Sequence, residues 1–213
     1  LRVERFRLAN PEQEFIQIRL DKIKQLREKG INPYPSKFPK THTNSEALSD
    51  FLKSETLEEE SNSSQIRLAG RVVARRTMGK ATFIDITDFS GRIQIMMRQN
   101  NLTDRYELLD QLDIGDWLGA TGKIFRTRTK EITLQVDDFE IICKALRPLP
   151  EKWHGLTDTE TRFRQKYLDL ISNEKSVTNA LIRSNLIKSI RHFMEQRGFI
   201  EVETPILVPI AAG

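Results

Sequence analysis

The chain has 213 residues, of which 38% are hydrophobic and 30% are charged, so it can bury a sizeable core in one or two domains. Its 34 basic and 30 acidic residues give a formal net charge of +4, which is compatible with an RNA partner but too small to indicate one. A single cysteine excludes an intrachain disulfide, three scattered histidines argue against a zinc site, and no apolar run approaches the roughly 20 residues that span a bilayer. We therefore expect a cytoplasmic protein without a membrane segment.

Residues 1–64 are predicted to form a helical and extended segment ahead of the main domain. Asn10 and Pro11 are typical of a helix start, and Gly30 is typical of a helix end. This helix carries an apolar stripe of Ile16, Leu20, Ile23 and Leu26. Its other faces are basic, Arg19 and Lys22 included, which indicates either a solvated surface or an arm that contacts phosphates.

An extended stretch and a second, shorter helix follow. Three prolines within residues 31–40 require an extended backbone, and the helix is expected around residues 46–53. Its inward side chains are predicted to be Leu48, Phe51 and Leu52. Residues 57–64 are acidic and serine-rich, which indicates an exposed loop.

Three consecutive strands are predicted next, over Ile66–Arg76, Thr82–Asp88 and Arg92–Arg98, with glycine turns between them. Successive side chains of a strand point to opposite faces, so the second and third strands each have an aliphatic and a polar face. The aliphatic faces are expected in the core. The polar face then carries Phe83 together with Gln94, Arg92, Arg75 and Arg76.

An aromatic ring on a polar, basic sheet face is suited to stacking on an unpaired base, and an amide beside it can read the edge of that base. Phe83 and Gln94 therefore indicate a site for single-stranded RNA, and Lys80 adds positive charge in the neighbouring turn. The alternative is that Phe83 belongs to a minor core beneath a loop. In that case its loss would lower stability and leave RNA affinity unchanged.

A helix over Asn101–Asp113 and two more strands complete this domain, which we place at residues 65–145. The last two strands are joined by a hairpin at Thr127–Lys130, which is flanked by Arg126 and Arg128. Three strands, a helix and two strands are the element order of the oligonucleotide-binding (OB) fold, a five-stranded Greek-key barrel. Glu131 opens the fifth strand, where its carboxylate either accepts a hydrogen bond from a base or faces solvent.

The rest of the chain is predicted to be a linker, residues 146–160, and a second domain over residues 161–213. The second domain is expected to contain two helices and a strand, over Arg162–Ile171, Glu174–Arg197 and Phe199–Glu203. Asn173 is a suitable cap for the longer helix, and Gly198 is suited to end it. These elements do not make a complete domain.

At this point the chain resembles the bacterial-type lysyl-tRNA synthetases, a class II family, along essentially its whole length. The anticodon domain of that family is similar to AGRVVARRTMGKATF at residues 69–83 and GRIQ at 91–94. Its linker resembles KALRPLP at 144–150, and the entry to its catalytic domain resembles TRFRQKYLDLIS at 161–172. Motif 1 of class II enzymes resembles RGFIEVETP at 197–205. Aspartyl- and asparaginyl-tRNA synthetases share the barrel and motif 1, but the linker and entry segments resemble the lysine enzyme.

The resemblance implies roles for particular residues. Phe83 would stack on the central uridine of the anticodon, Gln94 and Glu131 would hydrogen-bond to that uridine, and Arg76 would contact its neighbours. Possible contacts to the tRNA backbone are Arg75, Lys80, Arg92, Arg126 and Arg128. Motif 1 implies a homodimer interface, to which we assign Phe193, Gly198, Phe199, Val202 and Pro205.

The resemblance also implies an α+β fold, in which the OB barrel and its N-terminal helix precede the start of an antiparallel-sheet catalytic domain. The full-length protein would be an ATP- and magnesium-dependent lysine–tRNA ligase. Motifs 2 and 3, whose arginines bind ATP in this family, are expected beyond residue 213, and no glycine loop of the GxxxxGK type occurs. We assign no catalytic, cofactor or metal residue here, and expect this chain to bind lysine tRNA, but no DNA, and to form no lysyl-adenylate.

Other interpretations stay open. The chain would also suit a stand-alone OB-fold protein that binds RNA or a partner, in which residues 161–213 serve only for dimerisation. A relative of the aspartyl- or asparaginyl-tRNA synthetases is a further alternative. These residues do not distinguish a paralogue that uses the same scaffold to modify another protein.

Overall fold

The structure is a computed structural model that describes residues 11–56, 65–150, 156 and 158–206. The chain divides into two compact units, Leu1–Pro148 and Leu149–Gly213. The predicted helix cap at Asn10, the loop at 57–64 and part of the predicted linker lie outside the described residues.

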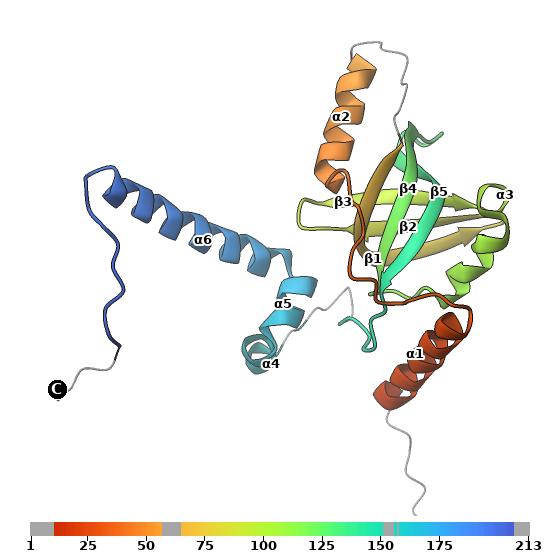
Figure 1. Ribbon diagram of the computed structural model, residues 1–213, viewed down its shortest axis with the longest axis horizontal. Coiled ribbons are helices and arrows are strands. Elements are labelled where there is room, and N and C mark those ends of the chain that lie inside the picture. The colour runs from red at the N-terminus through yellow and green to blue at the C-terminus, as the bar shows by residue number, and fades with distance from the viewer. Residues whose placement is uncertain (1–10, 57–64, 151–155, 157, 207–213) are drawn as a thin grey trace, which may run out of the picture. The chain divides into compact units, whose positions relative to one another are not determined.

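The first unit is built on a closed five-stranded barrel (Figure 1). Its strands are β1 (Ile66–Met78), β2 (Ala81–Thr87), β3 (Arg92–Arg98), β4 (Trp117–Arg126) and β5 (Ile132–Cys143). Around the barrel the strands follow the order β1-β2-β3-β5-β4, and β4 pairs with β1 to close it. The β3–β5 pair is parallel and the other pairs are antiparallel. This is the predicted OB fold, with strand limits that differ by at most two residues from those expected for β1 to β3.

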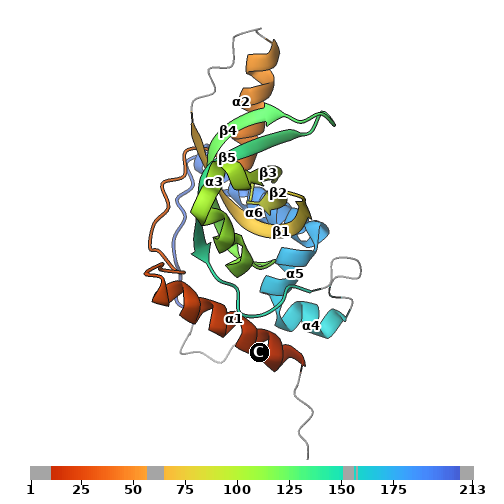
Figure 2. The same ribbon diagram turned by 90° about the vertical axis from the view of Figure 1, so that its right-hand side faces the viewer.

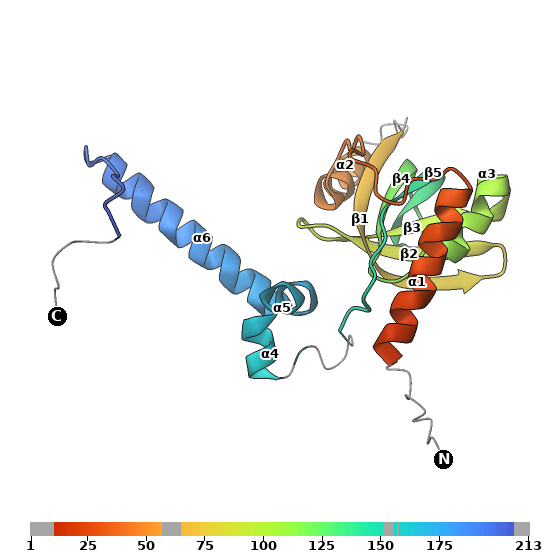
Figure 3. The ribbon, with the colours of Figure 1, turned by 60° about the horizontal axis from the view of Figure 1, so that its bottom comes forward.

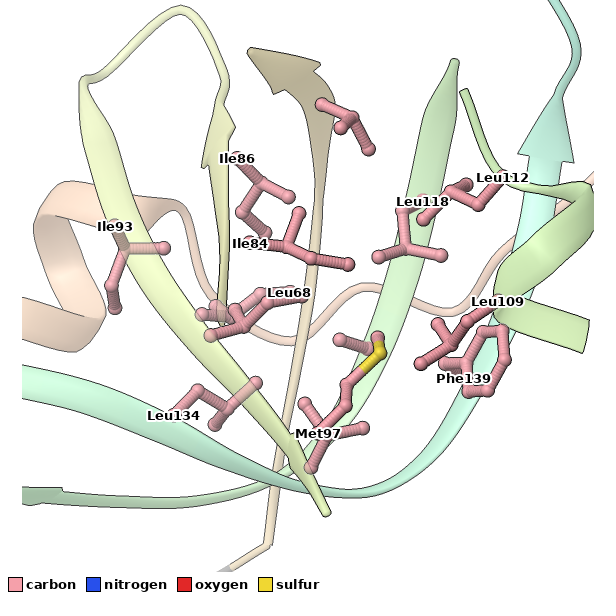
Figure 4. Packing of buried hydrophobic residues seen from close by; sticks show 14 of the residues in the cluster. Leu68, Ile84, Ile86, Ile93, Met97, Leu109, Leu112, Leu118, Leu134 and Phe139 are labelled. Atoms are coloured by element: carbon pink, nitrogen blue, oxygen red, sulfur yellow. The ribbon is translucent and has the colours of Figure 1, made fainter. Parts of the chain in front are cut away.

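Period-two alternation fills the barrel interior with aliphatic side chains. Ile84 and Ile86 of β2 are completely buried, as are Ile95 and Met97 of β3. Figure 4 shows the side chains of Leu68, Ile84, Leu118 and Leu134 directed into the same space between the strands. The predicted aliphatic faces of β2 and β3 are therefore confirmed as core.

Two helices lie at opposite ends of the barrel (Figures 1 and 2): α1 (Pro11–Glu28) and α2 (Asn44–Thr56). The predicted apolar stripes of both helices are partly wrong. Leu20 of α1 and Leu52 of α2 are exposed, whereas Arg19 is buried and Ala47 joins the core. Helix spacing alone does not reveal that a buried guanidinium occupies the position where α1 meets the barrel.

The helix predicted at Asn101–Asp113 is instead a short α3 (Gln99–Leu102) followed by a 3₁₀ helix, η1 (Thr103–Gln111). Thr103, the first residue of η1, has a positive φ of 44°, which a continuous α-helix does not allow. This segment still covers the core, since Leu109 and Leu112 are buried and Tyr106 packs against the core.

A polar cluster joins α1 to the start of the linker. The Arg19 guanidinium donates to the carbonyl oxygens of Ile114 (3.0 Å), Ala145 (2.6 Å) and Arg147 (3.0 Å). Because the Arg19 guanidinium is occupied by these hydrogen bonds to the backbone, it is not free to contact phosphates. Beside it, the ammonium of Lys22 lies 2.6 Å from a carboxylate oxygen of Asp113.

Lys144 is the centre of this cluster. Its side chain is completely buried and its ammonium binds Asp113 at 2.7 Å, the carboxylate of Asp116 and the carbonyl oxygen of Gln111. Burial by itself raises the pKa of Asp113, but the hydrogen bonds and charges of Lys144 and Lys22 outweigh it and hold the pKa below its ordinary value. A buried cation with two carboxylates therefore fixes the place where the chain leaves the barrel.

The second unit contains α4 (Thr159–Arg164), α5 (Lys166–Ser172) and the long α6 (Glu174–Glu195) (Figure 3). The single helix predicted at Arg162–Ile171 is wrong, because Gln165 leaves the helical conformation with φ −112° and ψ 56°. The break lets Arg162 and Lys166 both reach the buried carboxylate of Asp169. Hydrogen bonds from Lys166, Ser176 and Arg162 hold the pKa of this carboxylate well below its usual range.

The start of α6 is as predicted, since the Asn173 side chain accepts a hydrogen bond from the Lys175 N–H at 3.1 Å. The strand predicted at Phe199–Glu203 does not form. A strand needs a hydrogen-bonding neighbour, and the described part of this unit contains no other strand. None of the helices in the described ranges is both long and apolar enough to cross a bilayer.

Replacing Lys144 by Met should lower the free energy of unfolding by about 3–5 kcal/mol, because Asp113 and Asp116 would lose their buried cation. Urea denaturation measures the loss, and the exposed Arg147→Ala variant is the control, with an expected change below about 0.5 kcal/mol.

The depressed pKa of Asp113 stabilises the fold above its unfolded pKa of about 3.9, and that contribution disappears as pH falls through the folded pKa. The gap between wild type and Lys144→Met should therefore narrow below about pH 4, and a gap that is constant with pH would contradict this.

Candidate nucleic-acid interface

The outer face of the sheet brings the predicted RNA-binding residues into two neighbouring rows. In the first row, strand pairing aligns Arg76, Phe83, Met96 and Gln135. In the second row, it aligns Ala74, Asp85, Gln94 and Thr133. Directly opposite residues of paired strands share a face, so Phe83 and Gln94 lie on one surface, on adjacent strands and in adjacent rows.

Phe83 is half-buried and is not part of the hydrophobic core. Across the first row it stands opposite the exposed Arg76 on one side and the buried Met96 on the other. The ring thus has an apolar neighbour to support it and a guanidinium beside it. This arrangement suits an aromatic ring that stacks on a base, because stacking requires one face of the ring to stay accessible.

Gln94 is oriented by Thr133, whose hydroxyl donates to its Oε1 atom at 3.0 Å. The Nε2 group remains as a hydrogen-bond donor, and no described residue accepts from it. Thr133 is a residue that sequence analysis missed as a participant. The signal was present, since Thr133 alternates with the aliphatic residues of β5 on the polar side.

Glu131 lies one residue before β5, at the end of the β4–β5 hairpin. Its carbonyl oxygen accepts from the Thr127 N–H at 2.9 Å, and its own N–H donates to the Thr127 hydroxyl at 3.0 Å. The side chain is exposed and has no hydrogen bond or ion pair with any of the described residues. Its backbone is therefore held while its carboxylate stays available.

The basic residues proposed for backbone contact fall into two groups. Arg76, Lys80 and Arg128 are exposed and make no ion pair within the described ranges. Arg75 pairs across the sheet with Ile84 of the core, so it does not share the face of Phe83. Its guanidinium instead donates to the carbonyl oxygens of Leu109 at 2.7 Å and Leu112 at 3.2 Å.

Arg92 and Arg126 are also engaged within the fold. Arg92 lies 2.5 Å from Asp85, whose carboxylate is buried on the outer face beside Gln94. Arg126 binds Glu55 of α2. Sequence analysis found these arginines but did not name their acidic partners. Asp85 lies on the adjacent strand, only seven residues before Arg92, whereas Glu55 comes from α2, which only the tertiary fold places beside Arg126.

The residues predicted at a dimer interface lie at and after the end of α6. Phe193, Phe199 and Val202 are exposed by 51%, 59% and 71%. Gly198 has a φ of +82°, which allows the turn after α6. The Arg197 guanidinium lies 3.5 Å from the centroid of the Phe193 ring. Among the described residues, Phe199 and Val202 are therefore largely exposed, and Phe193 is about half exposed beside Arg197.

Sequence comparison agrees with this geometry. Residues 66–142 match the family model of the OB-fold nucleic acid binding domain. Residues 158–213 match the model of class II tRNA synthetases of the D, K and N type. The chain therefore contains one segment that is similar to an OB-fold nucleic acid binding domain and a second that is similar to part of a class II tRNA synthetase domain.

Several relatives that match most of the chain are named lysine–tRNA ligases. That of Carboxydothermus hydrogenoformans is 49% identical over 201 residues, which are 94% of this chain and 40% of the relative. That of Dehalococcoides mccartyi is 47% identical over 204 residues, with 95% and 41% covered. That of Legionella pneumophila is 44% identical over 202 residues, with 95% and 40% covered. The chain spans about two fifths of the length of these curated relatives.

Replacing Phe83 by Ala should separate stacking from core packing. We expect a loss of about 1–3 kcal/mol in affinity for single-stranded RNA and a loss of only about 1 kcal/mol in stability. Phe139→Ala, which removes a buried ring, should instead cost about 3–5 kcal/mol in stability. Phe89→Ala removes an exposed ring from the β2–β3 turn and should leave RNA affinity unchanged. A Phe83→Ala variant that loses stability as Phe139→Ala does, and keeps its RNA affinity, would identify Phe83 as core.

Proposed function

We propose that this chain is the anticodon-binding part of a lysine–tRNA ligase, which joins lysine to its tRNA at the expense of ATP. The observation that carries the proposal is the shared outer face of Phe83, Gln94 and Arg76, with Glu131 on the adjoining hairpin. The identity of the relatives supports lysine over aspartate and asparagine.

The available groups match the edge of a uracil base. Uracil presents two carbonyl oxygens on either side of an N3–H group, so it needs donors and one acceptor. The Nε2 group of Gln94 supplies a donor, and the Glu131 carboxylate supplies an acceptor for N3–H. Cytosine has a lone pair at N3, which would face the carboxylate without a proton between them. The site therefore favours uridine over cytidine.

The proposal assigns each remaining residue a simpler task. Phe83 stacks on the base, and Arg76, across the strand from it, contacts the neighbouring nucleotides. Lys80 and Arg128 are the exposed cations available to the tRNA backbone, whereas Arg75, Arg92 and Arg126 act first through their partners in the fold.

ATP and magnesium belong to the proposed full-length enzyme. The described residues contain no group of three acidic, histidine or cysteine side chains that could hold a metal ion. No catalytic step is therefore assigned to the described residues. The proposed place of the reaction is the cytoplasm.

We also propose that the full-length protein is a homodimer that uses α6 and the segment after it. The support is the apolar surface of the second unit. Its exposed members on α6 include Leu181, Ile182, Leu186, Ile190 and Phe193. An apolar face of this length is typical of a surface that another chain covers. The alternative of a stand-alone RNA-binding protein has less support, because the relatives that match most of this chain are ligases.

The test is tRNA binding by transcripts that differ only at the middle anticodon nucleotide. Changing that uridine to cytidine should weaken binding by about 1–3 kcal/mol. Glu131→Gln should bring the two affinities closer, because an amide can donate to N3 of cytosine. Arg128→Ala, which removes a non-specific cation, should weaken both complexes alike. Equal affinity of the wild-type chain for both transcripts would contradict the proposed function.

A further inference from the structure

We propose that Glu55 of α2 is a positioning residue that fixes the β4–β5 hairpin through Arg126 and so sets the place of Glu131. This proposal rests on the proposed function, because it gives the hairpin a part in recognising uridine. Arg126 then serves to shape the hairpin, instead of contacting the tRNA backbone as expected from the sequence.

Arg126 uses all of its nitrogens within the fold. Its Nε donates to Oε1 of Glu55 at 2.9 Å, and its Nη2 donates to Oε2, which makes a two-pronged contact. Its Nη1 donates to the carbonyl oxygen of Lys130 at 2.8 Å. A planar guanidinium that binds a carboxylate in this way has a fixed orientation. Glu55 therefore orients the Nη1 group of Arg126, which donates to the hairpin at the carbonyl oxygen of Lys130.

The hairpin needs this support because its tip is strained. Lys130 has a φ of +65°, a conformation that residues with a side chain rarely adopt. The Lys130 N–H donates to the carbonyl oxygen of Thr127 at 2.9 Å, and the Lys130 carbonyl oxygen accepts a hydrogen bond from Arg126. Glu131 follows directly and bonds to Thr127 through its N–H and its carbonyl oxygen. Arg126 thus acts one residue before the proposed uridine acceptor.

The other end of α2 is anchored to the barrel. The Asn44 side chain donates to the carbonyl oxygen of Gly91 at 3.0 Å, and the Asn44 N–H donates to Asp88 at 3.1 Å. The Ser45 N–H donates to the hydroxyl of Ser90 at 3.0 Å. Ala47 lies in the core, and the Phe51 ring packs against it 6.0 Å from the Arg126 guanidinium. The helix is therefore a strut from the β2–β3 turn to the β4–β5 hairpin (Figure 1).

The pair remains charged near neutral pH. The hydrogen bond from Arg126 lowers the pKa of Glu55, and the same bond raises the pKa of Arg126. A phosphate group would have to displace Glu55 before it could take both prongs of the guanidinium. The geometry thus opposes a direct phosphate contact at Arg126 and leaves that task to Arg128, at the tip of the hairpin.

The experiment compares the 213-residue wild-type chain with Glu55→Ala and Glu55→Gln. The readout is the ratio of affinities for the transcripts with uridine and with cytidine at the middle anticodon position. We expect both variants to lower this ratio by roughly three- to tenfold, as befits the loss of a supporting hydrogen bond. Asp50→Asn removes an exposed charge from the same helix and should leave the ratio unchanged. Hydrogen exchange of the Glu131 N–H should be faster in both Glu55 variants and unchanged in Asp50→Asn.

Each other outcome counts against Glu55 as a positioning residue. If Glu55→Ala strengthens binding of both transcripts equally, Glu55 competes with phosphate for Arg126. If the ratio is unchanged while the unfolding midpoint falls, Glu55 is merely structural. Should Glu55→Ala fail to fold, the isosteric Glu55→Gln decides by the same two measurements. A wild-type chain that does not distinguish the transcripts would instead refute the proposed function, so the two failures are separable.

Discussion

Closing the sheet into a barrel gives each strand one inner and one outer face, and the rest of the first unit depends on this constraint. Along each strand of a closed barrel, side chains point alternately into the interior and out toward the outer surface. The isoleucines of β2 and β3 fill the interior, so the residues between them must lie outside. Phe83 and Gln94 share the outer surface because of their place in this alternation. The core and the proposed recognition surface thus follow from one pattern.

The loops around the barrel are held by ion pairs whose partners are distant in the sequence. Lys144 binds Asp113 and Asp116 where the chain leaves the barrel, and Arg126 binds Glu55 at the β4–β5 hairpin. Both contacts fix backbone: the segment by which the chain leaves the barrel in one case, and the hairpin that precedes the proposed base acceptor Glu131 in the other. A small barrel of this kind can read an unpaired base only if its loops keep their shape, since each hydrogen bond has a narrow range of distance.

The local sequence pattern predicts the position of a residue correctly where its neighbours lie on the same strand or on an adjacent strand. It therefore placed Phe83 and Gln94 correctly, along with the OB fold and the cap at Asn173. It placed Arg75 beside Arg76, although adjacent residues of a strand point to opposite faces. The predicted strand at 199–203 had no pairing partner, and the break at Gln165 depends on the buried Asp169. Such features are set by tertiary contacts that spacing does not encode.

The most direct measurement is a nuclear magnetic resonance titration of the chain with a short single-stranded RNA that contains three consecutive uridines. If the outer face binds the base, the shifts should concentrate on the ring protons of Phe83, the side-chain amide of Gln94 and the backbone of Thr133. The ring protons of the buried Phe139 should not move. Saturating binding that leaves Phe83 and Gln94 unchanged, and shifts residues elsewhere on the barrel, would contradict the proposed interface.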